Sequence, residues 1–320
     1  MSNKKQKKYT AISLFAGVGG ICQGFINNGV EIVFANDIDK NACKTYRENF
    51  KHGIIESPIE DIKVEDIPDA DLVLFGFPCT SFSIAGYQKG FEDEKTGNLF
   101  FEALRIIKAK QPKAFLLENV KNLVGHDKGN TFRVIKEALE DAGYYFRYQV
   151  LNSMEYGNVP QNRERIYVVG FKDKNQCDKF YFPEPIPLTT RIEDITKPSE
   201  KKDDKYYYNK TKYYPMLAET MTNKETVYQI RRVYVRENKK NVCPTLTANM
   251  GTGGHNVPLI IDDFGIRKLT TKECFMIQGF PEDYKTPENV ANGQLYKQAG
   301  NSVTVTVIER IAKNMINAMK

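Results

Sequence analysis

The sequence lacks any apolar run near the roughly 18 residues that a bilayer-spanning helix needs, so we do not expect an integral membrane protein. Residues 1–10 carry four lysines and no apolar stretch, which predicts a loose basic tail, not a secretory signal. No CxxC pair and no Cys/His spacing typical of zinc occurs, so we expect no metal site. Free thiols in a reducing cytoplasm are the expected state of the six scattered cysteines: Cys22, Cys43, Cys79, Cys177, Cys243 and Cys274.

The net positive charge of the chain is concentrated in one segment. The chain has 46 Lys and Arg against 40 Asp and Glu, and residues 205–256 hold nine of the former and three of the latter, so the remainder is neutral. The same stretch contains seven of the 18 tyrosines. A basic, Tyr-rich block on a neutral body predicts a local site for a polyanion, and a solvated lysine-rich surface is the alternative.

Apolar runs and helical patterns alternate over the first 170 residues. We expect strands at 10–15, 31–35, 71–77, 113–117, 145–151 and 166–171. We expect helices at 19–28, 39–50, 98–110, 131–142 and 302–319. This alternation predicts an α/β fold with a doubly wound, mostly parallel sheet. Between 173 and 263 the helical periodicity fades and prolines and glycines cluster, which predicts a smaller, irregular, β-rich domain.

A glycine-rich turn, Phe15-Ala16-Gly17-Val18-Gly19-Gly20, follows the first strand and precedes a helix. Glycines let the backbone approach a ligand, and a helix N-terminus offers free N–H groups. Asp37 ends the next strand, where it could accept from a ribose hydroxyl, and Asp61 could face an adenine amino group. The pattern is not GxGxxG, so a nucleoside site is favoured over a nicotinamide site. A tight turn without a ligand is the alternative.

Cys79 follows Gly76-Phe-Pro just beyond a buried strand, at the sheet edge where open α/β folds bind ligands. A nucleophilic thiolate is one interpretation and a buried structural cysteine the other. Glu118 ends the next strand after an apolar run, so a desolvated carboxyl group could keep a proton near neutral pH. Arg163 and Arg165 alternate in an extended segment, so we expect both to point the same way and to hold an anion or a carbonyl. Ordinary ion pairs are the alternative for these charges.

Six motifs stand in order along the chain: Phe15–Gly20, Gly76–Cys79, Glu118–Val120, Gln161–Arg165, Arg267–Thr270 with Gln278–Pro281, and Gly300–Val303. This series resembles the cytosine-C5 DNA methyltransferases of bacterial restriction–modification systems, over nearly the whole chain except the tail and much of 173–263. The resemblance implies the Rossmann-like fold of S-adenosylmethionine-dependent methyltransferases. It also implies a catalytic and cofactor-binding domain at 11–174 plus 285–320, and a target-recognition domain at 175–284.

The resemblance implies a covalent mechanism. Cys79 would attack C6 of a cytosine, Glu118 would contact N3 and the exocyclic amine, and Arg165 would hold the carbonyl. Arg163 would support the catalytic loop. Methyl transfer from S-adenosylmethionine would leave S-adenosylhomocysteine as product. Because the target atom is unreachable inside a duplex, the cytosine would be flipped out.

The resemblance further implies which residues bind the cofactor. One departure is Ile38, where the family often has a large side chain such as Trp stacking on adenine, so we expect a modestly different affinity. The expected cofactor-binding residues are Phe15, Ala16, Gly17, Gly19, Gly20, Asp37, Ile38, Asp61, Ile62, Pro78, Leu99, Asn301, Ser302 and Val303.

For DNA, the loop at 86–97 would close over the extruded base, with Ser83 and Lys89 as phosphate contacts. Thr245 matches a Thr-Leu element and would contact the backbone of the flipped nucleotide. Gln229 would fill the gap left by the flipped base, and Arg232 would read a guanine edge. Phosphate contacts that position without specifying sequence would come from Arg236, Lys239 and Lys240, with Arg231 as a further DNA contact.

Two other functions in this chemistry or fold remain open. A tRNA cytosine methyltransferase is one, and the sizeable insert favours duplex DNA over it. A catalytically silent DNA-binding homologue is the other, and the intact Cys79, Glu118 and Arg165 argue against it. We expect a monomer that acts on double-stranded DNA at a short GC-rich palindrome, alongside a cognate restriction endonuclease.

Overall fold

The computed structural model describes residues 8–78, 99–231, 234–238, 241–252 and 256–320. The chain forms two compact units. The first consists of Met1–Leu151, Glu164–Pro183 and Ile308–Lys320, and the second of Asn152–Arg163 and Glu184–Val307. In these described ranges, no helix is both long enough and apolar enough to span a membrane.

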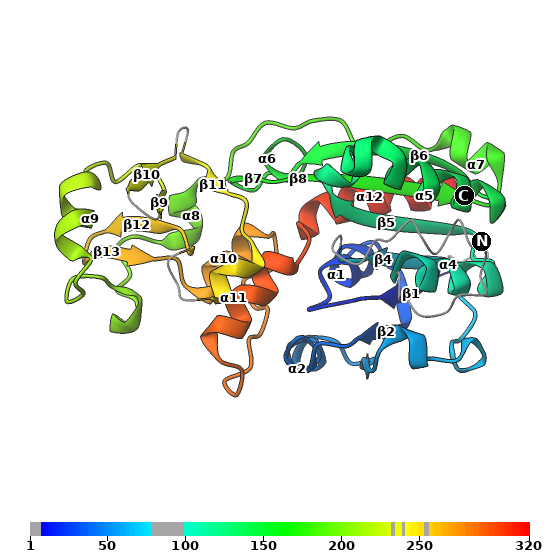
Figure 1. The fold of residues 1–320 in the computed structure, drawn as a ribbon, viewed down its shortest axis with the longest axis horizontal. Coiled ribbons are helices and arrows are strands. Elements are labelled where there is room, and N and C mark those ends of the chain that lie inside the picture. Colours follow the sequence, from blue (N-terminus) through cyan, green and yellow to red (C-terminus); the bar gives the residue numbers. More distant parts are fainter. Residues whose placement is uncertain (1–7, 79–98, 232–233, 239–240, 253–255) are drawn as a thin grey trace, which may run out of the picture. The chain divides into compact units, whose positions relative to one another are not determined.

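The first unit is built on a seven-stranded sheet with the order β3-β2-β1-β4-β5-β8-β6 (Figure 1). Its strands are β1 (Thr10–Leu14), β2 (Glu31–Asp37), β3 (Ile55–Glu56), β4 (Leu72–Gly76), β5 (Ala114–Val120), β6 (Tyr145–Asn152) and β8 (Glu164–Phe171). The pairs from β3 across to β5 are parallel, and β5 pairs with β8 antiparallel. Strands buried on both faces appear as continuous apolar runs, which is why the sequence predicted β1, β4, β5 and β8. The exposed two-residue β3 was not predicted. The predicted α/β fold is confirmed.

Helices pack on both faces of this sheet. They are α1 (Gly20–Ile26), α2 (Lys40–Asn49), α4 (Leu99–Lys110), α5 (Asn130–Asp141), α7 (Lys174–Lys179) and α12 (Val305–Ala318), with short 3-10 turns η1 (Ile59–Asp61), η2 (Val64–Asp66), η4 (Lys121–Val124) and η5 (His126–Gly129). On one face, Ile12 and Leu14 of β1 share a core with Phe100 of α4 and Ile135 of α5.

The opposite face carries α1 and α12. Ser13 alternates with Ile12 and Leu14 along β1, and its hydroxyl is near enough to Cys22 of α1 to influence the pKa of that thiol. Gly24 of α1 lies against α12, since a Cβ there would be 2.6 Å from Cγ2 of Ile308. Both faces of the sheet are therefore covered, which leaves its strand ends as the accessible edges.

The second unit contains a four-stranded antiparallel sheet with the order β10-β9-β12-β13, which confirms the predicted β-rich region. Leu217 packs into its core with Tyr228, Leu259 and Ile266. The strands are β9 (Tyr228–Ile230), β10 (Val235–Glu237), β12 (Leu259–Asp262) and β13 (Gly265–Lys268), and β7 (Gln161–Asn162) pairs separately with β11 (Cys243–Pro244). Its helices are α6 (Ser153–Tyr156), α8 (Ile192–Thr196), η6 (Asp204–Tyr206), α9 (Tyr214–Thr220), η8 (Ala248–Gly251), α10 (Thr271–Ile277) and α11 (Asn292–Asn301).

The units differ in bounds from the predicted domains. Residues 285–307, which we expected to accompany the large sheet, belong to the second unit. Gly300 at the end of α11 explains this, because a Cβ there would lie 2.1 Å from the carbonyl carbon of Thr247. Ser153 and Thr304 are also joined, with 2.7 Å between their hydroxyl oxygens. The functions assigned to the two domains stay predictions.

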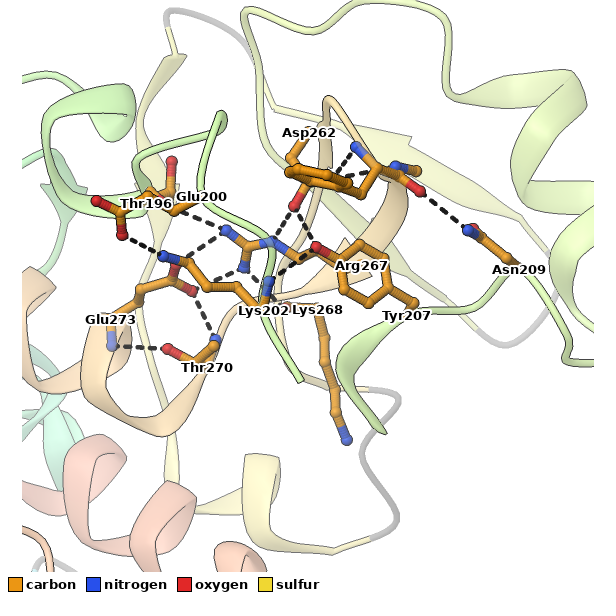
Figure 2. A network of polar contacts seen from close by, with 12 residues as sticks. Thr196, Glu200, Lys202, Tyr207, Asn209, Asp262, Arg267, Lys268, Thr270 and Glu273 are labelled. Atoms are coloured by element: carbon orange, nitrogen blue, oxygen red, sulfur yellow. Dashed lines mark hydrogen bonds and ion pairs between the residues drawn. The ribbon is translucent and has the colours of Figure 1, made fainter. Parts of the chain in front are cut away.

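A buried ion-pair network joins the small sheet to α10 (Figure 2). The inaccessible Arg267 lies 2.6 Å from Asp262 through Nε and donates twice to Glu273 over 2.9 Å each. It also donates to the carbonyl of Thr196, while the Tyr207 hydroxyl donates to Asp262 over 2.9 Å. Burial alone lowers the pKa of Arg267, but the hydrogen bonds and charges of Glu273 and Asp262 outweigh this and raise the pKa. The network fixes α8, β12, β13 and α10 to one another.

Candidate active site

The glycine turn is held by the end of β2. The N–H of Gly17 donates to Oδ2 of Asp37 over 2.7 Å, and the N–H of Asp39 donates to Oδ1 over 2.8 Å. The N–H of Ala16 donates to the carbonyl of Asn36 over 2.8 Å. Each carboxylate oxygen has a second lone pair, so Asp37 can accept further hydrogen bonds while it anchors the turn.

The turn depends on residues in the left-handed region. Phe15 has φ 52°, Gly17 has φ 56° and Gly19 has φ 82°. At Gly19 a side chain is also excluded by space, because a Cβ would lie 2.2 Å from the ring of Phe50. At Gly17 a Cβ would meet no atom within 4 Å, so open space adjoins the residue that holds Asp37. Gly20 follows as the first residue of α1.

This edge of the sheet has the groups that a nucleoside requires. Ile38 is 67% exposed directly after Asp37 and offers an apolar surface for a ring. Asp37 offers acceptors for ribose hydroxyls beside the open space at Gly17. Burial raises the pKa of Asp37, and the N–H groups of Asp39 and Gly17 offset part of that rise. These groups therefore fit the nucleoside part of S-adenosylmethionine.

The other predicted cofactor residues of the first unit lie on three further segments. The N–H of Ser57 donates to the carbonyl of Asp37, which ties the start of one segment to the end of β2. Asp61 is exposed on that segment, and Ile62 is buried in the core against which Leu99 packs. Pro78 is exposed directly after β4.

Glu118 and Arg165 meet on one face of the sheet. Register pairs Gly76 with Glu118, and Val120 with Arg165, so strand alternation turns both charged side chains to the same side. Nε of Arg165 lies 3.3 Å from Oε1 of Glu118, and the two side chains are only 14% and 11% exposed. A Cβ on Gly76 would be 3.1 Å from Oε2 of Glu118, so glycine leaves room for the carboxylate there. This contact matches the alternative of an ordinary ion pair, and the catalytic roles of the two residues stay predictions.

Asn119, next to Glu118, joins the ends of β4 and β5. Its side-chain nitrogen donates to the carbonyl of Phe77 over 2.8 Å, and its side-chain oxygen accepts from the N–H of Val120 over 2.8 Å. Sequence reasoning gave this residue no role. The signal that could have identified Asn119 is its position as a polar residue in a buried apolar strand.

Four of the predicted site residues, Cys79, Ser83, Lys89 and Arg232, lie outside the described residues, as do Lys239 and Lys240.

Arg163 and Arg165 have different partners. The 2%-exposed Arg163 donates to the carbonyls of Leu246 over 2.8 Å, Gly300 over 3.3 Å and Ser302 over 2.6 Å. Arg165 instead contacts Glu118. The expectation that both arginines point the same way is therefore wrong. Arg163 donates to carbonyl groups and Arg165 forms an ion pair, because β7 ends at Asn162 and β8 begins at Glu164.

The clamp by Arg163 fixes the predicted Asn301–Val303 segment in the second unit. Asn301 is exposed there, while Ser302 and Val303 are buried. Two further buried glutamines, whose roles the sequence did not predict, brace the same region. Gln161 accepts from the N–H of Leu246 and donates to Oε1 of Gln278 over 3.0 Å each. Gln278 donates to the carbonyl of Ala299 over 2.7 Å.

Three of the predicted DNA contacts lie on the β9–β10 hairpin. Gln229 is paired in register with Arg236, and Nη2 of Arg231 donates to Oε1 of Gln229 over 3.1 Å. Thr245 lies elsewhere, with its hydroxyl donating to the carbonyl of Asn162 over 2.7 Å. In the described part of the chain, no group of three or more His, Cys, Asp or Glu is arranged to hold a metal ion.

Solved structures with the same fold include the DNMT2 mutant of Spodoptera frugiperda, with a TM-score of 0.75 at 20% identity, covering 97% of this chain and 100% of that one. A putative DNA modification methyltransferase from an Escherichia coli prophage has a TM-score of 0.72 at 20% identity, covering 98% and 99%. At these identities the similarity concerns the fold.

Sequence comparison reaches further. The chain is 62% identical over 310 residues to the Type II methyltransferase M.Bsp6I of Bacillus sp. (strain RFL6), covering 96% of this chain and 98% of that protein. It is 37% identical to the Type II methyltransferase M.HhaI of Haemophilus parahaemolyticus, covering 97% and 96%. The model of the C-5 cytosine-specific DNA methylase family, whose members depend on S-adenosylmethionine, matches residues 9–317. The chain therefore belongs to the C-5 cytosine-specific DNA methylases and is a DNA cytosine-5 methyltransferase.

Proposed function

We propose that this enzyme methylates C5 of a cytosine flipped out of a specific short site in duplex DNA, through a covalent bond between Cys79 and C6. The observation that carries the proposal is the ion pair of Glu118 and Arg165. The Glu118 carboxylate lies beside Gly76, and Gly76 precedes Cys79 by three residues in the sequence. A low-exposure carboxyl group and a guanidinium at a strand end suit the polar edge of one pyrimidine.

The groups have different tasks in this reaction. The Cys79 thiolate adds to C6, and a proton held by Glu118 is shared with N3, so the electron pair of the C5–C6 double bond collects at C5. Arg165 fixes Glu118 and donates to the O2 carbonyl. After methylation a base, through water, removes the C5 proton, the C6–S bond breaks, and the thiolate returns. Arg163 holds the backbone of the segment around Gly300 and Ser302.

S-adenosylmethionine, when bound, supplies an electrophilic methyl group on a sulfonium. Asp37 would accept the ribose hydroxyls, Ile38 would cover the adenine and Asp61 would accept from its amino group. The remaining cofactor contacts come from the glycine turn, Ile62, Pro78, Leu99 and Asn301–Val303. The open space at Gly17 and the exposed side chain of Ile38 support this assignment.

Duplex DNA would bind through the second unit and the loop after Cys79. Thr245 and the β9–β10 hairpin provide contacts in the second unit, with Arg232, Ser83 and Lys89 completing the set. Because the chain is similar to M.Bsp6I, a protein named as a Type II methyltransferase, we propose that this enzyme has a role in restriction–modification. The enzyme would act as a monomer in the cytoplasm and protect DNA from a cognate endonuclease.

Bisulfite sequencing of DNA from cells expressing the protein tests this function. We expect one short motif to be methylated at C5, and no methylation with Cys79→Ser. Radiolabelled methyl transfer to purified DNA and to tRNA separates the two substrates. Methylation by Cys79→Ser would contradict the mechanism, and incorporation into tRNA alone would contradict the substrate.

A further inference from the structure

One face of the β9–β10 hairpin is turned away from the core of the second unit. Ile230 pairs with Val235, and both pack with the apolar cluster around Tyr228. Alternation then turns the other positions outward. Gln229 and Arg236 are opposite one another on this outer face.

Two more outward positions extend the same face. The N–H of Arg231 donates to the carbonyl of Tyr234 over 2.8 Å, which continues the hairpin beyond the Ile230–Val235 pair. The side chains of Arg231 and Arg236 are exposed, and Tyr234 is 55% exposed. The outer face, defined by Gln229, Arg231, Tyr234 and Arg236, thus presents two cations and one aromatic ring on a two-stranded ribbon. A ribbon of this width fits the major groove of B-DNA.

The guanidinium of Arg231 is held in place by Gln229. Nη2 of Arg231 donates to Oε1 of Gln229 over 3.1 Å. This bond uses one of five N–H donors and limits rotation of the guanidinium plane, while the remaining donors stay arranged as a fork. A phosphate contact needs only charge, but bidentate recognition of the O6 and N7 acceptors of guanine needs a fixed plane.

We propose that Arg231, oriented by Gln229, reads one guanine of the recognition sequence in the major groove. The proposal rests on the function proposed above. It gives Gln229 a positioning role in place of filling the gap left by the flipped base. It also assigns base reading to Arg231, and leaves Arg236 as a contact to the phosphate backbone.

The test uses the full-length enzyme and duplexes built on the motif found by bisulfite sequencing. In each duplex either one base pair is changed or one guanine is replaced by 7-deazaguanine, which lacks the N7 acceptor. Values of kcat/KM are measured for wild type and for Arg231→Ala, Gln229→Leu, the double variant, Arg232→Ala and Arg236→Ala. All these substitutions except Arg232→Ala fall at outward positions of the hairpin, and thermal melting with S-adenosylmethionine binding confirms that each variant is folded.

We expect Arg231→Ala to lose discrimination at a single guanine by about 5- to 150-fold, the range of one bidentate contact, and to become insensitive to 7-deazaguanine there. Gln229→Leu should give a smaller loss at the same guanine and no further loss when Arg231 is already alanine. Arg236→Ala should weaken every duplex alike and reduce the salt dependence.

Three results would overturn the proposal while wild type still methylates DNA. The first is an equal loss on all duplexes, or unchanged preference, for Arg231→Ala. The second is relaxation at a guanine by Arg232→Ala alone. The third is an undiminished effect of Gln229→Leu in the Arg231→Ala background. Absence of any methylation by wild type would instead contradict the proposed function itself.

Discussion

The side-chain nitrogen of Asn119 donates a hydrogen bond of 2.8 Å to the carbonyl of Phe77, and so ties the end of β5 to the end of β4. Asn119 directly follows Glu118, and Phe77 stands two residues before Cys79. The bond is buried, with Asn119 only 3% exposed. It therefore sets the relation between the strand that carries Glu118 and the segment that leads to Cys79, the proposed nucleophile.

Replacing Asn119 should impair catalysis more than cofactor binding. Asn119→Asp keeps the acceptor for the N–H of Val120 but removes the donor to Phe77, and a buried carbonyl without a partner costs about 1–3 kcal/mol. We expect kcat to fall by about 10-fold or more, the equivalent of some 1.4 kcal/mol of transition-state stabilisation. Single-turnover methylation measures this. Asn122→Ala, on the exposed surface of η4, is the control, and equal kinetics for the two variants would contradict the role of Asn119.

Removing the charge of Asp37 should weaken cofactor binding. Asp37→Asn loses acceptors for the ribose and opposes the N–H donors of Gly17 and Asp39, so we expect the Kd for S-adenosylmethionine to rise by about 10- to 100-fold, as hydrogen bonds to a charged group are worth about 1.5–3 kcal/mol. Titration calorimetry measures the change. An unaltered Kd would contradict the proposed role of Asp37 in binding S-adenosylmethionine.

The same carboxylate gives binding a pH dependence with a definite sign. Hydroxyl donors bind the ionised form, and burial raises the pKa of Asp37. The Kd should therefore increase as pH falls, and the increase should begin at a higher pH than an ordinary aspartate would give. The Asp37→Asn variant should lack this part of the pH profile. A wild-type Kd that is flat down to the ordinary range of aspartate would contradict the assignment.

The network around Arg267 should dominate the stability of the second unit. Glu273→Ala leaves a buried guanidinium with Asp262 as its remaining carboxylate, so we expect the free energy of unfolding to fall by about 3–5 kcal/mol. Urea denaturation measures this. Glu282 forms a 2.8 Å ion pair with Lys197 on the surface, where the side chains are 60% and 40% exposed. Glu282→Ala should change the stability little, and a comparable loss in both variants would contradict the importance of burial.

Thiol reactivity should single out Cys79. The five described cysteines are buried, and burial raises the pKa of each thiol, to about 12 for Cys43. At pH 8 they should react slowly with iodoacetamide, because the thiolate is the reactive form. Mass spectrometry of the native protein should find rapid alkylation at Cys79 alone. Equal labelling of Cys243 and Cys79 would contradict the prediction that Cys79 is the reactive thiol.

The sequence was most informative where a pattern is local. Apolar runs predicted six of the seven strands of the large sheet, all except the two-residue β3. Residues at the strand ends, such as Asp37 and Glu118, were recognisable because a polar group follows a buried segment. The ion pair of Glu118 and Arg165 was not predicted as a pair, because it depends on the antiparallel register of β5 and β8.

Relationships between distant segments were out of reach. Arg163 and Arg165 are two residues apart in the sequence, but the strand is interrupted between β7 and β8. Arg163 therefore donates hydrogen bonds to three carbonyl groups in the second unit. Residues 285–307 belong to the second unit because Gly300 packs closely against the backbone of Thr247. The presence of a glycine in the sequence does not reveal such a contact. The outward face of the β9–β10 hairpin likewise depends on register, since a shift of one residue would bury Gln229 and expose Ile230.

Covalent trapping on a 5-fluorocytosine duplex tests the central claim most directly. Fluorine at C5 cannot leave as a proton does, so after methyl transfer the C6–S bond should persist. With the target cytosine replaced and S-adenosylmethionine present, wild type should form a denaturant-stable complex in which mass spectrometry places the DNA on Cys79. A wild-type enzyme that methylates the unmodified duplex but forms no such adduct, or forms it on another residue, would contradict the account.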